Sequence, residues 1–136
     1  MEFRLEDLLH KMVEKGASDL HVKAGSPPGF RIDGRVVPQE EFGRLSPDIT
    51  RALAYQILTK DQVAVFERDG DLDCSHAIKD LARFRVNVLT QRNSVGMVIR
   101  VIPDRIPTAE DLRLPPICLE LALKPRGLVL VTGPTG

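Results

Sequence analysis

The stretch between residues 83 and 105 is rich in side chains suited to binding an anion. It contains five arginines, no lysine and one acidic residue, Asp104. The arginines are Arg83, Arg85, Arg92, Arg100 and Arg105. A guanidinium group donates paired hydrogen bonds in one plane, which suits bidentate capture of phosphate or carboxylate. The alternative is a solvated basic surface balanced by acids elsewhere in the chain, such as Asp71, Asp73 or Glu67.

The spacing of apolar residues predicts that two of these arginines face each other in a β-hairpin. Apolar and polar side chains alternate over residues 81–90 and again over 95–102, as expected for strands with one buried face. A register that pairs Phe84 with Val101 brings the two apolar sets together, and it sets Arg85 opposite Arg100. Like charges in this position cost stability, and an anion bound between them would relieve the cost. We therefore predict an anion site, with Arg100→Ala neutral or slightly stabilising in this chain alone.

The last ten residues match a strand and the first half of a phosphate-binding loop. Residues 127–132 are mostly apolar and predict a buried strand, after which Gly133, Pro134, Thr135 and Gly136 fit the first four positions of the pattern GxxxxGK[ST]. Backbone amides of such a loop cradle phosphates. The alternative is an ordinary turn after a strand. No folded domain is expected to end at this point. Because the lysine and the hydroxyl of the pattern are not among the 136 residues, we expect this chain alone to be inactive as an ATPase.

The remaining pattern predicts an α+β fold with a mostly antiparallel sheet and flanking helices. Helices are expected over residues 4–15, 47–58, 60–70 and 116–123, and strands over 19–24, 30–32, 35–37, 71–78, 81–90 and 95–102. Ser46 and Thr59 have the sequence context of helix N-caps, and Asp33-Gly34 is a strong hairpin-turn signal. Pro103 and Pro107 mark a linker. We expect one domain over 1–104, and a linker with the start of a second domain over 105–136.

Composition narrows the class of protein. The 19 basic residues are matched by 19 acidic ones, which argues against a general nucleic-acid or anionic-membrane binder. Apolar residues make up 43% of the chain, too many for a disordered protein, yet no apolar run is long enough to span a bilayer. Two cysteines without metal-ligand spacing argue against a disulfide scaffold or a zinc site, and no metal-ligating residues are predicted. For His21 we expect a structural hydrogen bond rather than a catalytic or metal-binding role.

Five segments occur in the order found in one family. They are Ala17–Val22, Pro27–Gly34, Ala82–Asn87, Val98–Pro103 and Arg126–Gly136. In these segments the chain resembles the PilT-type retraction (twitching-motility) ATPases of type IV pili, which belong to the secretion-ATPase superfamily. The resemblance covers nearly the whole chain and corresponds to the amino-terminal part of such a motor, ending inside the Walker A loop. One departure is Cys74-Ser75, where the family more often has an aromatic residue before the serine.

The resemblance implies a fold, a function and partners. The fold would be a PAS-like amino-terminal domain followed by a linker and a RecA-like P-loop domain. The longer protein would be a homohexamer that hydrolyses ATP with Mg²⁺, acts on an inner-membrane pilus platform protein, and binds no nucleic acid. It would lie in the cytoplasm, peripheral to the inner membrane. The positions that match the family's phosphate-contacting arginines are Arg85 and Arg100, and Gly133 and Gly136 match its phosphate loop.

Two other functions stay open from the sequence. One is a pilus-extension or type II secretion ATPase, although those usually carry long additional amino-terminal domains. The other is a non-enzymatic PAS-like module that binds a ligand or a partner. With five phenylalanines, one tyrosine and no tryptophan, the chain has few aromatic residues to line a flavin or haem pocket.

Overall fold

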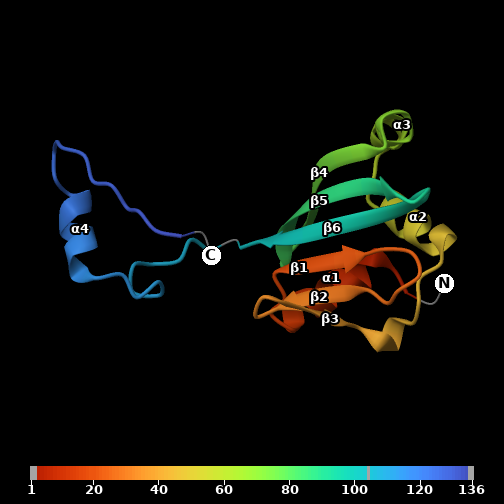
Figure 1. Ribbon diagram of the computed structural model, residues 1–136, viewed down its shortest axis with the longest axis horizontal. Coiled ribbons are helices and arrows are strands. Elements are labelled where there is room, and N and C mark those ends of the chain that lie inside the picture. The colour runs from red at the N-terminus through yellow and green to blue at the C-terminus, as the bar shows by residue number, and fades with distance from the viewer. Residues whose placement is uncertain (1–2, 104, 135–136) are drawn as a thin grey trace. The chain divides into compact units, whose positions relative to one another are not determined.

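The computed structural model describes residues 3–103 and 105–134, which divide into two units, Met1–Asp104 and Arg105–Gly136. In the first unit six antiparallel strands form one sheet in the order β3-β2-β1-β6-β5-β4 (Figure 1). The strands are β1 (Asp19–Val22), β2 (Gly29–Ile32), β3 (Arg35–Pro38), β4 (Asp71–Ile78), β5 (Ala82–Gln91) and β6 (Ser94–Ile102). The predicted α+β fold with an antiparallel sheet is confirmed.

Three α-helices accompany this sheet. They are α1 (Leu5–Glu14), α2 (Pro47–Tyr55) and α3 (Lys60–Asp69), with a short 3-10 helix at Glu40–Phe42. Each helix lies within a few residues of its predicted range, because the sequence contains residues typical of helix ends. The Ser46 hydroxyl accepts a hydrogen bond from the Ile49 amide at 3.2 Å, and Thr59 and Gln62 exchange bonds of 3.2 and 3.0 Å across the start of α3. Gly70 ends α3 in the left-handed conformation, at φ 75°.

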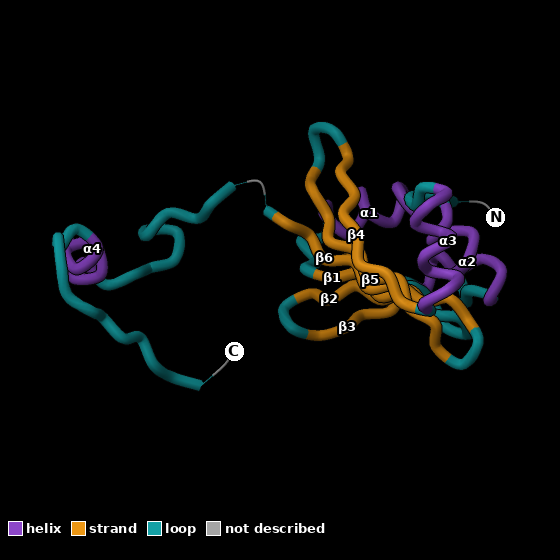
Figure 2. Tube along the Cα trace, turned by 90° about the horizontal axis from the view of Figure 1, so that it is seen from above, coloured by secondary structure: helices purple, strands orange, loops and turns teal. Residues whose placement is uncertain are grey.

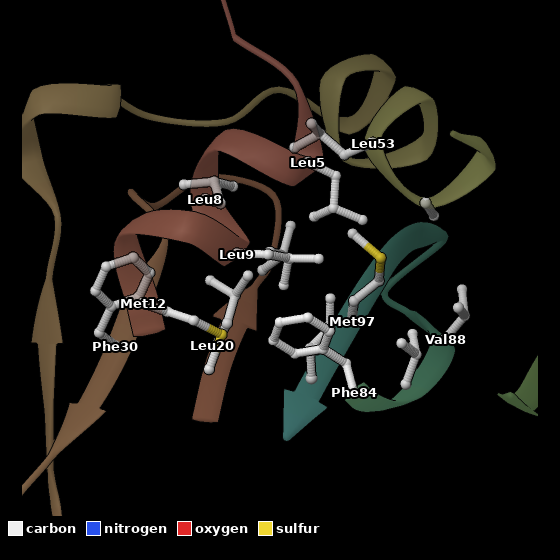
Figure 3. Close-up of a cluster of buried hydrophobic side chains, with 14 of the residues drawn as sticks. Leu5, Leu8, Leu9, Met12, Leu20, Phe30, Leu53, Phe84, Val88 and Met97 are labelled. Carbon is white, nitrogen blue, oxygen red and sulfur yellow. The ribbon is translucent and has the colours of Figure 1, made fainter. Parts of the chain in front are cut away.

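The core lies between helices α1 and α2 and one face of the sheet, on the side where Figure 2 shows both helices. Leu5, Leu8, Leu9 and Met12 recur on one side of α1 and are fully buried. Figure 3 shows them directed at side chains of β1, β2, β5 and β6, among them Leu20, Phe30, Phe84 and Met97. Burying one such side chain contributes about 1.5–3 kcal/mol. This core therefore fixes which face of every strand is turned away from the helices.

Two tight turns set the strand register. Asp33 and Gly34 between β2 and β3, and Arg92 and Asn93 between β5 and β6, all have positive φ, from 48° to 79°. Two consecutive residues of this kind form the hairpin turn whose twist matches that of antiparallel strands. The Asp33-Gly34 hairpin was predicted. At Arg92-Asn93 no glycine marks the turn, and it was located only by the alternation on either side.

Among residues 105–134 the second unit has one helix, α4 (Pro116–Ala122), as predicted from its two prolines. Thr108 and Asp111 exchange hydrogen bonds of 3.0 and 3.1 Å in a turn before it. The predicted buried strand after Gly127 is wrong for the described part of this unit. Leu128, Val129, Leu130 and Val131 form no strand and are between 55% and 95% exposed. A strand needs a neighbour for its backbone groups, and no described strand pairs with these residues.

No helix within residues 3–103 and 105–134 is long and apolar enough to cross a membrane.

Candidate anion-binding site

The predicted register of the arginine hairpin is confirmed. Strands β5 and β6 pair Phe84 with Val101 and Val86 with Ile99, so the apolar side chains of the hairpin share the core face. The same pairing places Arg85 directly opposite Arg100 on the other face. Both arginines are exposed. The helices do not bury this face, which we call the open face of the sheet.

A third strand adds an acidic residue that the alternation within the hairpin does not predict. Asp19 on β1 pairs with Arg100 on one side and with Arg31 of β2 on the other. Its Oδ1 accepts a hydrogen bond from Arg100 Nε at 2.9 Å, and its Oδ2 lies 3.3 Å from Arg31 Nε. Ser18 Oγ donates to Oδ2 at 2.8 Å. The carboxylate thus accepts two side-chain hydrogen bonds and forms a further ion pair with Arg31, although its side chain is only 6% exposed.

The protonation of Asp19 follows from these contacts. Burial by itself raises the pKa of the carboxyl group, because it disfavours the charged form. Hydrogen bonds from Arg100 and Ser18, and the positive charges of Arg100 and Arg31, outweigh burial and hold the pKa below its ordinary value. Asp19 is therefore ionised at neutral pH. It neutralises part of the charge that the facing arginines bring together.

Arg85 has no such partner. No ion pair or side-chain hydrogen bond joins its guanidinium to any other residue in the part of the chain that the structure describes. The acids expected as balancing charges have other contacts. Asp71 and Asp73 accept hydrogen bonds from Asn87 at 2.8 and 3.3 Å, and Glu67 pairs with Arg51 at 2.8 Å. None of these three acids forms an ion pair with Arg85 or Arg100 among the described residues, although Asp73 lies close to both.

A hollow of about 230 Å³ opens on this face between the arginines. It is lined by Asp19, Asp73, Arg85, Asn87, Val98 and Arg100. Both carboxylates on its wall already accept hydrogen bonds, from Arg100 and from Asn87. The hydrogen bond of Arg100 uses Nε, which leaves its two terminal nitrogens available. One guanidinium group at this hollow is fixed by an acid, and the other is unpaired among the described residues, so both can donate hydrogen bonds to an anion such as a phosphate group.

The other arginines of the stretch lie elsewhere. Arg92 sits in the β5–β6 turn and lines a separate hollow of about 440 Å³ together with Lys23. Seven residues of strand separate it from Arg85, which corresponds to about 23 Å. Arg105 pairs with Asp111 at 2.9 Å in the second unit. Arg83 lies on the open face opposite Ile102.

His21 lies on the open face of β1, two residues after Asp19. Its Nε2 is buried and has no hydrogen-bond partner among residues 3–103 and 105–134, so the predicted structural hydrogen bond is wrong for this nitrogen. Burial, and to a lesser extent the charge of Arg31, lower the pKa of His21. Within the same residues, no group of three or more His, Cys, Asp or Glu side chains is placed to hold a metal ion.

The proposed phosphate loop is described only in part. Gly133 and Pro134 are exposed and belong to no helix or strand. Thr135 and Gly136 lie outside the described residues.

The fold and the geometry define an antiparallel α+β domain with two facing arginines on the open face of its sheet. No model of a known protein family matches the chain. Individual proteins do. The chain is 44% identical over all 136 residues to the type IV pilus ATPase PilU of Pseudomonas aeruginosa, of which it covers 35%. It is 40% identical over 132 residues to the type IV pilus retraction ATPase PilT of the same organism, of which it covers 38%.

A solved structure agrees with these relatives. The crystal structure of the pilus retraction motor PilT with bound ADP matches 99% of the chain with a TM-score of 0.81 and 41% identity, and the chain covers 39% of it. The chain is therefore similar to the PilT and PilU type IV pilus ATPases over nearly its whole length, and it spans little more than a third of the length of these relatives.

Proposed function

We propose that this chain is the amino-terminal domain of a motor ATPase that retracts type IV pili, and that Arg85 and Arg100 contact the phosphates of ATP. The observation that carries the proposal is the pairing of Arg85 with Arg100 at the edge of one hollow, with Arg85 unpaired among the described residues. The named relatives are pilus ATPases, and the similar solved structure of a PilT holds ADP, which supports a nucleotide as the anion.

The chemistry asked of the arginines is electrostatic. Phosphoryl transfer spreads negative charge over the phosphate oxygens, and donors held in place for that charge lower the barrier. Arg100 is held by Asp19, and Arg85 is free to adjust to the incoming oxygen atoms. In this proposal both side chains approach the phosphates from the open face of the sheet, while Mg²⁺ is held outside this chain.

The proposal extends to the rest of the molecule. Residues 1–104 are a PAS-like domain, and residues 105–136 are a linker and the start of a RecA-like domain whose phosphate loop begins with Gly133, Pro134, Thr135 and Gly136. The longer protein assembles as a homohexamer in the cytoplasm, peripheral to the inner membrane, and acts on the pilus platform protein there. Closure of the first domain over ATP, and its release after hydrolysis, would then drive movement.

The test is the steady-state ATPase rate of the longer protein with Arg85→Ala, Arg100→Ala or Arg92→Ala. Loss of one donor to developing phosphate charge typically lowers kcat about 10²-fold or more, so we expect this for the first two variants. Arg92 is the matched control: it is an arginine of the same hairpin, about 23 Å away along the strand, and its removal should leave the rate near that of the wild type. Melting temperatures are measured alongside. Equal damage from all three variants would show that the arginines are structural and that the proposal is wrong.

A further inference from the structure

We propose that Asp19 is a positioning residue that fixes the Arg100 guanidinium for contact with a phosphate, and that Arg31 holds Asp19 in place. The inference rests on the proposed function and adds to it the residues that orient one of its two arginines. It is argued from the row Arg31–Asp19–Arg100, which lies across strands β2, β1 and β6.

The first step is the freedom that Arg100 would otherwise have. Its side chain is 71% exposed, and a long exposed arginine samples many rotamers. Holding such a side chain in one rotamer costs conformational entropy. The 2.9 Å hydrogen bond from Arg100 Nε to Asp19 Oδ1 fixes the side chain before any ligand binds, so this entropy is not lost on binding. Because the bond uses Nε, both terminal nitrogens stay available for a phosphate.

The second step is that Asp19 is itself fixed. Its side chain is 6% exposed, and its second oxygen is held by Arg31 Nε at 3.3 Å and by Ser18 Oγ at 2.8 Å. Arg31 is tied in turn, since its Nη1 donates to the Gly34 carbonyl at 3.0 Å. The contacts therefore run from the β2–β3 turn to Arg100. A carboxylate anchored on both oxygens can orient a guanidinium, whereas a mobile one would follow it.

The third step is the contrast with Arg85. It faces the same hollow with no described partner, so its order depends on the ligand. A purely structural ion pair at Asp19 would affect stability alone. A positioning role also predicts a loss of turnover that a destabilising change away from the hollow, such as loss of the Thr59 cap, does not share.

The kinetic test compares Asp19→Asn, Arg31→Ala and Arg100→Ala in the longer protein. Misplacing a group that acts in the transition state can cost up to about 10²-fold, and we expect Asp19→Asn to lower kcat by about tenfold or more with little change in KM for ATP. Arg31→Ala removes one anchor of that carboxylate and should lower kcat by a smaller factor. A fourth variant, Thr59→Ala, is the matched control, because it removes a helix cap that borders no part of the hollow. It should lower the melting temperature but leave kcat near the wild-type value. If Asp19→Asn keeps wild-type kcat while Arg100→Ala loses it, Asp19 does not position Arg100 and the phosphate role stands. If Arg100→Ala itself keeps wild-type kcat, the proposed function fails.

A second measurement does not depend on turnover. In the 136-residue chain, the side-chain Nε–H signals of arginines can be followed by ¹H–¹⁵N NMR. The Arg100 Nε–H should exchange slowly with water and appear rigid, whereas the Arg85 Nε–H should exchange rapidly and appear mobile. Acidification that protonates Asp19 should make the two alike, as should Asp19→Asn where that variant folds. Equal mobility of the two arginines in the wild-type chain at neutral pH would overturn the proposal.

Discussion

Arg85 and Arg100 occupy equivalent places in one hairpin but have different contacts. Strand alternation predicted that they face each other, and the pairing confirms it. Alternation within one hairpin could not reveal Asp19, because that residue lies on another strand, 81 positions before Arg100 in the chain. The sequence therefore predicted the arginines but neither the acid that holds one of them nor the hollow they border.

This difference corrects the expectation that Arg100→Ala is neutral or stabilising. Removing Arg100 takes a charged hydrogen bond from a buried carboxylate, which costs about 1–3 kcal/mol. Arg85→Ala removes no described partner and relieves repulsion, so it should change the free energy of unfolding by no more than about 0.5 kcal/mol. Urea denaturation of the two variants of the 136-residue chain measures both. Equal effects, or a more stable Arg100→Ala variant, would mean that the Asp19 contact does not form.

The Asp19 carboxyl also predicts a pH dependence. Its pKa is lower in the folded chain than the ordinary value of 3.8, so the unfolded chain binds the proton first as pH falls. The stability that Asp19 contributes is thus fully present above about pH 4 and is lost as pH drops through the lower, folded-state pKa. Urea unfolding of wild type and Asp19→Asn between pH 2 and 6 isolates this group. Other acids, such as Glu41 with its pKa lowered to about 2 by Lys11, contribute equally to both. We expect the gap between the two chains to narrow toward pH 2, and a constant gap would contradict this.

At the scale of elements, local signals were enough to predict most helices and strands. Caps such as Ser46 and Thr59 act within a few residues, and the hairpins close through short turns. Both can therefore be predicted from short segments of the sequence. The predicted strand after Gly127 is wrong because no strand among the described residues pairs with it. An apolar run becomes a strand only where another strand supplies hydrogen bonds.

The capping box of α3 gives a test at this scale. Thr59→Ala removes the hydroxyl that accepts from the Gln62 amide, and loss of such a cap costs about 1 kcal/mol. Thr59→Ser keeps the hydroxyl and is the matched control. Chemical denaturation should show the loss for alanine and near-wild-type stability for serine. A destabilised serine variant would place the effect in the methyl group instead of the cap.

At the scale of the whole molecule, the two units differ in how far their apolar side chains are buried. The first unit has a closed core, while the apolar residues Leu128 to Val131 of the second are exposed. Under the proposed function these residues form the first strand of a nucleotide-binding domain. We expect their amides to exchange rapidly in the 136-residue chain and to be protected in the longer protein, while those of β5 and β6 are protected in both. Hydrogen–deuterium exchange measures this, and continued rapid exchange in the longer protein would argue against the strand.

The central claim is that Arg85 and Arg100 contact the phosphates of ATP, and the structure of the longer protein bound to a non-hydrolysable ATP analogue tests it most directly. We expect guanidinium nitrogens of both arginines about 2.7–2.9 Å from phosphate oxygens, with Arg100 Nε still on Asp19. A complex in which the nucleotide is fully bound while both arginines point to solvent, or pair only with carboxylates, would contradict the claim.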